Sequence, residues 1–74
     1  MTTRTNTQTQ RKLPVGPHGW SQLMTATIRR AEATQDPRLA GLRRAMVEGK
    51  AEGMLRKLGI ISEADLDREF PVGG

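Results

Sequence analysis

Signals for the start and end of helices are the feature that most limits what this chain can fold into. Asp36-Pro37 combines a side chain that caps a helix N-terminus with a proline suited to the first helical position. Gly59 stands where a helix end needs a positive φ, and Ile60 after it can contact Leu55. These residues predict one helix over about 37–58 that ends in a Schellman-type stop.

A second set of signals follows directly. Ser62 predicts the N-cap of a short helix, and Asp65 occupies the capping-box position three residues later. Ile61 can pack on Leu66 as a hydrophobic staple, and Pro71 ends the helix. We therefore expect a helix over about 63–69.

The first predicted helix covers about 21–33 and is indicated by apolar residues at helical spacing on one face. They are Trp20, Leu23, Met24, Ile28 and Ala31. No segment of four or more residues alternates as a β-strand does. The predicted fold is all-α, a small three-helix protein.

The N-terminal residues differ from this helical part. Residues 1–12 contain no apolar side chain after Met1, so burial cannot offset a backbone entropy of about 1–2 kcal/mol per residue. We predict a disordered basic arm over 1–12, an irregular Pro/Gly segment over 13–20 and a small helical domain over 21–72.

Composition excludes several function classes. The 74 residues contain no Cys and one His, so disulfides, thiolate metal sites and multi-His metal sites are excluded. No phosphate-binding loop or catalytic constellation is present, and we predict no enzyme activity, no catalytic residues, no metal and no cofactor. No apolar run reaches the roughly 18 residues of a membrane span, and the N-terminus does not resemble a signal peptide. We expect a cytoplasmic protein without membrane contact.

Charge is unevenly distributed. Residues 1–44 carry eight basic and two acidic side chains, whereas residues 45–74 carry four basic and six acidic ones. Nine of the twelve basic residues are Arg, which favours a GC-rich bacterial or phage source. The basic front half predicts nucleic-acid contact, with a solvated basic surface as the alternative. The candidate phosphate-binding residues are Arg4, Arg11, Lys12, Arg29, Arg30 and Arg44.

Small residues recur at every fourth position of the predicted 37–58 helix, at Gly41, Ala45, Gly49 and Gly53. A glycine inside a helix costs about 1 kcal/mol relative to Ala, so this ridge needs a packing reason. One reading is the close approach of a partner helix or a toxin groove. The alternatives are that the first helix packs there, or that the helix breaks near Gly49–Gly53.

The apolar residues of the same helix occupy two faces. One face holds Leu39, Leu42 and Met46, and the other holds Val47, Met54, Leu55 and Leu58. A helix packed on one neighbour needs only one stripe. Either a partner covers the second face, or the last helix and residues 70–72 fold back over it.

Residues 42–53, LRRAMVEGKAEG, resemble the toxin-binding region of ParD-type antitoxins. That region commonly reads Leu-Arg-x-Ala, an aliphatic residue, then x-Glu-Gly-x-x-Ser-Gly. Glu52 stands where the family usually has Ser. The resemblance covers these twelve residues and implies an antitoxin whose C-terminal helices wrap a RelE/ParE-like toxin.

The ridge, the two apolar faces and the resemblance predict a small helical protein-binding regulator, with an antitoxin-like neutraliser as its most concrete form. The partner would be a toxin or an enzyme subunit, and a homo-oligomer stays open. The predicted partner-binding residues are Leu42, Arg43, Met46, Glu48, Gly49 and Gly53. The alternative is a nucleic-acid-binding accessory protein that uses the basic arm and the Arg pairs.

Overall fold

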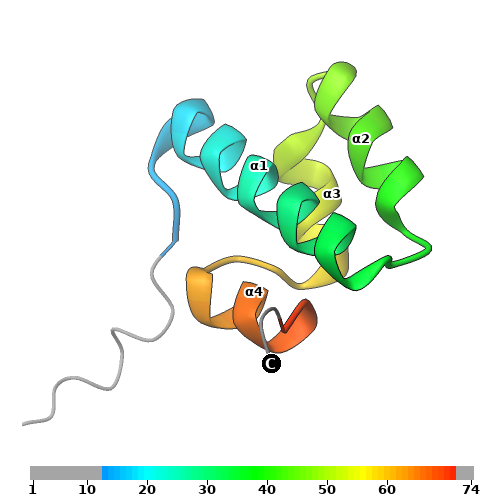
Figure 1. Cartoon of the computed structure of the whole chain (residues 1–74). Helices are drawn as coiled ribbons and strands as arrows, with labels where there is room; N and C mark the ends of the chain where they lie inside the picture. The colour runs from blue at the N-terminus through cyan, green and yellow to red at the C-terminus, as the bar shows by residue number, and fades with distance from the viewer. Residues whose placement is uncertain (1–12, 72–74) are drawn as a thin grey trace, which may run out of the picture.

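The computed structural model describes residues 13–71, which form four α-helices (Figure 1). In chain order these are α1 (Gly16–Thr34), α2 (Leu39–Val47), α3 (Ala51–Leu58) and α4 (Glu63–Glu69). The all-α prediction is confirmed, and within 13–71 there is no strand. The arm predicted over 1–12 lies outside the described residues, and so does the last residue of the predicted domain.

α1 begins at Gly16, so the irregular structure predicted over 13–20 is found only at 13–15 and the prediction is wrong for 16–20. Pro17 stands in the first turn, where its missing N–H and fixed φ favour a helix. A Cβ at Gly19 would lie 2.9 Å from the Cβ of Pro14, so this glycine lets the preceding chain pack against the helix. Two residue types that usually interrupt a helix therefore help to start this one.

The single helix predicted over 37–58 is also wrong, because the structure divides it into α2 and α3. Gly49 has a φ of +72° and its N–H donates to the carbonyl of Met46 at 3.2 Å. The N–H of Lys50 donates to the carbonyl of Ala45 at 2.8 Å. This pair of hydrogen bonds is a Schellman stop, so the alternative of a break near Gly49 is confirmed.

The stop at Gly59 and the start at Ser62 are confirmed. Gly59 has a φ of +80°, and the N–H of Ile60 donates to the carbonyl of Leu55 at 2.8 Å. The hydroxyl of Ser62 accepts the N–H of Asp65 at 3.3 Å and begins α4. Local hydrogen-bonding signals therefore set the connection between α3 and α4.

The predicted helix start at Asp36-Pro37 is wrong by two residues, because α2 is regular only from Leu39 and its N-cap position is Arg38, without a side-chain cap hydrogen bond. Asp36 instead closes the turn before the helix. Its carboxylate accepts the backbone N–H of Arg38 at 2.8 Å, and its carbonyl accepts the N–H of Leu39 at 3.0 Å. The chain thus makes one tight turn after Pro37 before the helix proper begins.

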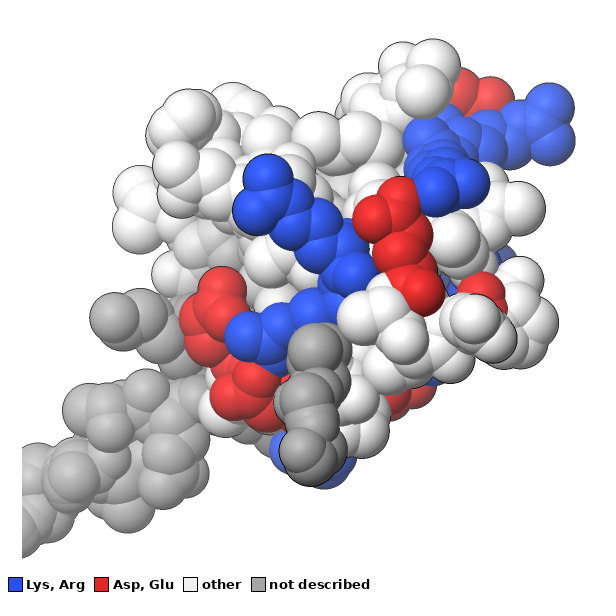
Figure 2. Space-filling view, viewed as in Figure 1, with Lys and Arg blue, Asp and Glu red and all other residues white. Residues whose placement is uncertain are grey.

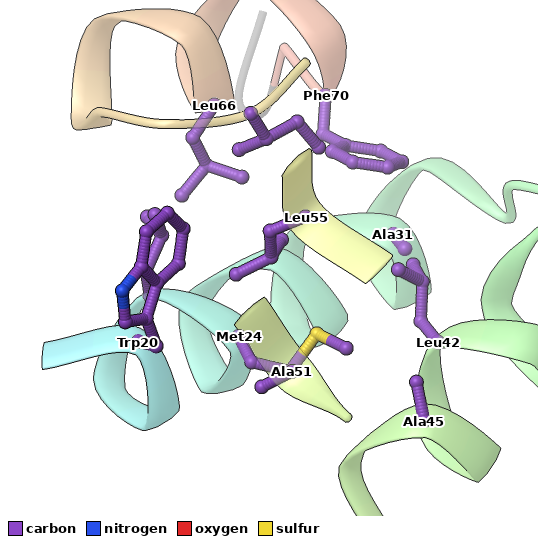
Figure 3. Packing of buried hydrophobic residues seen from close by; sticks show 11 residues of the cluster. Trp20, Met24, Ala31, Leu42, Ala45, Ala51, Leu55, Leu66 and Phe70 are labelled. Carbon is purple, nitrogen blue, oxygen red and sulfur yellow. The ribbon is translucent and has the colours of Figure 1, made fainter. Parts of the chain in front are cut away.

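The core lies where the helices meet (Figure 3). α1 packs against both α2 and α3, and side chains of Trp20, Leu55 and Leu66 gather from α1, α3 and α4. Phe70, just after α4, is fully buried. The expectation that the last helix and the residues after it cover the second apolar face holds only in part, because Leu55 is fully buried whereas Val47 of the same face is 87% exposed. The buried apolar residues are Trp20, Leu23, Met24, Ala31, Leu42, Ala45, Ala51, Leu55, Ile60, Leu66 and Phe70.

Candidate functional site

An open groove of about 630 Å³, which we call the α2–α3 groove, is lined by α2, the turn after it and α3. Its lining is Gly41, Arg44, Ala45, Glu48, Gly49, Lys50, Glu52, Gly53, Met54, Arg56 and Lys57. No residue of α1 or α4 belongs to this lining. Two short helices and their connecting turn therefore build the groove without help from the rest of the fold.

All four small residues of the predicted ridge line this groove, although the helix that was expected to carry them is broken. A Cβ at Gly53 would meet nothing within 4 Å, and one at Gly41 would meet only the Cε of Met54 at 3.5 Å, an ordinary contact. The packing of residues 13–71 thus gives neither helical position a reason to be glycine. Their effect is to keep the floor of the groove low and open.

The rim of the groove carries charged side chains in ion pairs. Glu48 lies between two cations, at 3.4 Å from Nε of Arg44 and 3.5 Å from Nζ of Lys50. Glu52 pairs with Nε of Arg56 at 2.9 Å, one helical turn away. Both rim carboxylates are therefore already neutralised by cations of the same rim.

Two rim cations differ in how they are held. The guanidinium of Arg56 lies over the ring of Trp20 at 5.0 Å from its centre, which ties this rim to α1. Lys57 forms no ion pair with any residue in the described part of the chain. Because Glu48 also serves two cations, Lys57 is one of two sources of unbalanced positive charge in the groove.

Three of the six predicted partner-binding residues, Glu48, Gly49 and Gly53, line the α2–α3 groove. The other three lie elsewhere. Leu42 is fully buried in the core, so we leave it out of the candidate surface. Arg43 pairs with Glu32 of α1.

The last predicted partner residue, Met46, is half-buried against the core. It lines a smaller hollow of about 200 Å³ between the start of α1 and the α2–α3 turn, beside Trp20. Gly49 borders both this hollow and the α2–α3 groove. The turn after α2 is thus exposed on two sides.

The predicted nucleic-acid-binding residues do not form one basic surface. Arg30 pairs with Asp67 and Glu63, and Arg44 pairs with Glu48. Figure 2 shows Lys and Arg side chains interleaved with Asp and Glu on the face it displays. Arg29 is exposed and has no ion pair within residues 13–71. The remaining candidates, Arg4, Arg11 and Lys12, lie outside the described residues.

Two carboxylates serve as structural clamps. Hydrogen bonds from the side chain and backbone of Arg38 lower the pKa of Asp36 to about 2, and Arg38 also binds Glu69 at 2.6 Å. Burial would raise the pKa of Asp65, but hydrogen bonds, led by the one from Ser62, outweigh it and lower the pKa. Both carboxylates are held by local hydrogen bonds at a helix end, so they are poor candidates for proton transfer.

Four charged residues of the groove were not among the predicted partner-binding residues. They are Lys50, Glu52, Arg56 and Lys57. Their spacing was the available signal. Arg56 and Lys57 follow Gly53 by three and four positions, which places them beside it on a helix. Lys50 could not be found this way, because it lies on the turn that the expected continuous helix did not contain.

Within the described part of the chain, no helix combines the length and apolar character that a membrane crossing needs. Among residues 13–71, His, Asp and Glu side chains nowhere form a group of three or more that could hold a metal ion. Comparisons with known proteins give no significant match to a family model, a curated protein or a solved structure.

Proposed function

We propose that this protein is a small helical protein-binding regulator that holds a segment of a partner protein in the α2–α3 groove. The observation that carries the proposal is the pair of helical glycines, Gly41 and Gly53, on the floor of the groove. Each is up to about 1 kcal/mol less favourable than Ala in a helix, and no contact within residues 13–71 requires it. A partner that approaches the floor closely supplies that reason.

The shape of the groove suits a short helical segment. α2 and α3 have nine and eight residues, so each wall is about 12–14 Å long and spans little more than two turns of a partner helix. The floor is formed by Ala45 and Met54 with the glycines, and the rim is charged. An apolar centre surrounded by a polar rim is the usual anatomy of a protein interface.

The most concrete form of this regulator is an antitoxin-like protein that neutralises its partner by covering it. Support comes from residues 42–53, the run that resembles the toxin-binding region of ParD-type antitoxins. This run supplies both walls of the groove, with Arg44 on α2 and Gly53 on α3. Of the seven residues that match the antitoxin pattern, four line the groove, namely Ala45, Glu48, Gly49 and Gly53.

Nucleic-acid binding is the competing function, and the described surface favours it less. Trp20 and Phe70, the two aromatic residues of the chain, are 5% and 0% exposed, so neither offers a face on which a base could stack. Arg30, Arg43 and Arg44 are held in ion pairs with acidic neighbours. Phosphates would have to displace those carboxylates.

The proposal is tested by crosslinking in the cells that naturally produce the protein. A photo-crosslinking amino acid at Arg44, which is exposed on the rim, should join the protein to one partner protein. Adding Gly53→Leu should abolish that crosslink by filling the groove, while Ala64→Leu on the exposed face of α4 should leave it unchanged. Circular dichroism should show the same helix content for both variants, because a side chain at 53 starts in open space.

An unchanged crosslink in the Gly53→Leu protein would refute the groove as the binding site. A crosslink to nucleic acid instead of protein would replace the proposal by its competitor.

The antitoxin-like form has its own test, which is co-expression with the product of the adjacent gene. If that product arrests growth, the intact protein should restore growth and the Gly53→Leu variant should not. If the product of the adjacent gene does not arrest growth, the antitoxin-like form is refuted. Protein binding in the groove is then decided by the crosslinking experiment alone.

A further inference from the structure

We infer that the partner segment is acidic, with carboxylates that meet the rim of the α2–α3 groove at Lys50 and Lys57. This inference rests on the proposed function, because it names the chemistry of the segment that the groove would hold. The rim contains four cations and two anions, Arg44, Lys50, Arg56 and Lys57 against Glu48 and Glu52. The groove is therefore positive by two charges.

The ion pairs show where the surplus lies. Glu48 is shared by Arg44 and Lys50, so one carboxylate serves two cations. Glu52 pairs with Arg56, and Lys57 forms no ion pair within residues 13–71. The surplus charge is thus centred near Lys50 at one end of α3 and on Lys57 at the other.

A bound segment would remove water from these cations. Taking a charge out of water is unfavourable unless an opposite charge replaces the solvent, and complementary charges also fix the register of a complex. Because residues 13–71 supply no further carboxylate to the rim, we expect the partner to supply it. Neutral or basic segments would leave Lys57 desolvated without compensation.

The spacing of the two lysines specifies the segment further. Lys50 and Lys57 are seven residues apart, which corresponds to about 10 Å along a helix axis. A helix lying along α3 meets both with carboxylates about two turns apart. Between them it must present small or apolar side chains to Ala45 and Met54 on the floor. The expected partner segment is an amphipathic helix with acidic residues at i and i+7.

A phosphate backbone fits the same groove less well. Its charges would approach Glu48 and Glu52 as closely as the cations, and the apolar floor offers phosphates no hydrogen-bond donor side chain. An acidic helix can place carboxylates at the two ends and keep the centre apolar. We therefore assign the groove to an acidic protein segment.

The test uses three labelled peptides of about four helical turns with one Ala/Leu face, differing only at two positions seven residues apart. These positions carry Glu, Gln or Lys, and binding to the full-length protein is measured by fluorescence anisotropy at low and high salt. We expect the Glu peptide to bind about five- to tenfold more tightly than the Gln peptide at low salt. The difference should shrink as salt screens the pairs.

Charge-reversal variants test whether the peptides bind in the α2–α3 groove. The double variant Lys50→Glu, Lys57→Glu should lose the preference for the Glu peptide and bind the Lys peptide instead. Arg29→Glu is the matched control, because Arg29 is an exposed cation outside the groove, and it should keep the wild-type order. Circular dichroism confirms that each variant is folded.

Equal or absent binding of the Glu and Gln peptides would overturn the inference, and so would an unchanged order in the double variant. A single-stranded oligonucleotide that binds more tightly than the Glu peptide and displaces it would assign the groove to nucleic acid. If the crosslinked partner is a protein whose docking segment carries no acid, the proposed function stands and the acidic segment is refuted.

Discussion

Two helix stops in this protein have the same backbone and opposite surroundings. Gly49 after α2 and Gly59 after α3 have φ values of +72° and +80°, and the same pair of Schellman hydrogen bonds closes each helix. They differ in the next residue. Lys50 has 72% of its side chain exposed, whereas Ile60 is 1% exposed and lies with Leu55 in the core. The residue after the glycine thus decides whether a stop is buried or open to solvent.

The two stops therefore contribute to different properties, the stop at Gly59 to folding stability and the stop at Gly49 to the proposed binding surface. The stop at Gly59 brings Ile60 into the core and directs the chain towards α4. The stop at Gly49 contributes little to the core and instead forms one end of the α2–α3 groove. A third stop, at Gln35 after α1, is closed by the polar clamp of Asp36 and Arg38. The chain therefore ends three helices with one backbone motif and three kinds of side-chain support.

The largest expected effect is at the buried stop. Ile60→Ala should lower the free energy of unfolding by about 2–5 kcal/mol, because it removes a buried side chain and leaves a cavity. Lys50→Ala, the equivalent change at the open stop, should alter it by less than about 0.5 kcal/mol. Urea unfolding followed by circular dichroism measures both. Ile60→Val, expected to cost about 0.5–1.5 kcal/mol, covers the case in which the Ala variant does not fold.

Similar losses for Ile60→Ala and Lys50→Ala would contradict this contrast. They would mean that both stops support the core equally.

A smaller effect should be common to the two stops. Gly59→Ala and Gly49→Ala each force a Cβ into the left-handed region, which costs about 1–2 kcal/mol. Neither new Cβ meets an atom within 4 Å, so backbone strain alone should set the loss. Chemical denaturation of the two variants should give losses that agree within about 0.5 kcal/mol.

A much smaller loss for Gly49→Ala would show that the open stop relaxes when strained. The expected form of that relaxation is a merging of α2 and α3 into one helix, visible as increased helix content.

The contrast between the stops also explains which parts of the fold were predictable. Gly59 could be recognised as a helix stop because Ile60 and Leu55 are both apolar and can form the contact that accompanies a Schellman stop. Gly49 is followed by Lys50, so its surroundings in sequence resemble those of a helical glycine. The break in the predicted 37–58 helix was therefore an alternative and not the main prediction.

The groove was predictable in part for the same reason. The spacing of Gly41, Ala45, Gly49 and Gly53 marked these residues as neighbours, and they do share one surface. That surface is concave because the chain turns at Gly49, which spacing alone cannot reveal. Leu42 was assigned to a partner because an apolar residue on a helix looks the same from sequence whether its own core or another protein covers it.

A third stop extends the comparison to a residue other than glycine. Gln35 ends α1 with a φ of +55°, a conformation that is strained for a residue with a Cβ. Gln35→Gly should relieve that strain, partly offset by the greater entropy of glycine in the unfolded chain, for a net gain of about 0.5 kcal/mol. Thermal unfolding should show a small rise in Tm. A loss of stability would show that the Gln35 side chain itself supports the turn.

The smallest expected effect is the pH dependence of the polar clamp at this third stop. Arg38 lowers the pKa of Asp36 from 3.8 to about 2, so the unfolded chain binds more protons than the folded one between these values. The stability that the clamp provides is therefore present above about pH 4 and is lost as the pH falls towards 2. The loss should be modest because solvent reaches Arg38 and screens the pair. In Asp36→Asn the slope of unfolding free energy against pH should decrease in this window, while the Ile60→Val variant keeps the wild-type slope at lower stability. If Asp36→Asn instead kept the full slope, the acid sensitivity would belong to another carboxylate, with Asp65 the next candidate because its pKa is also lowered.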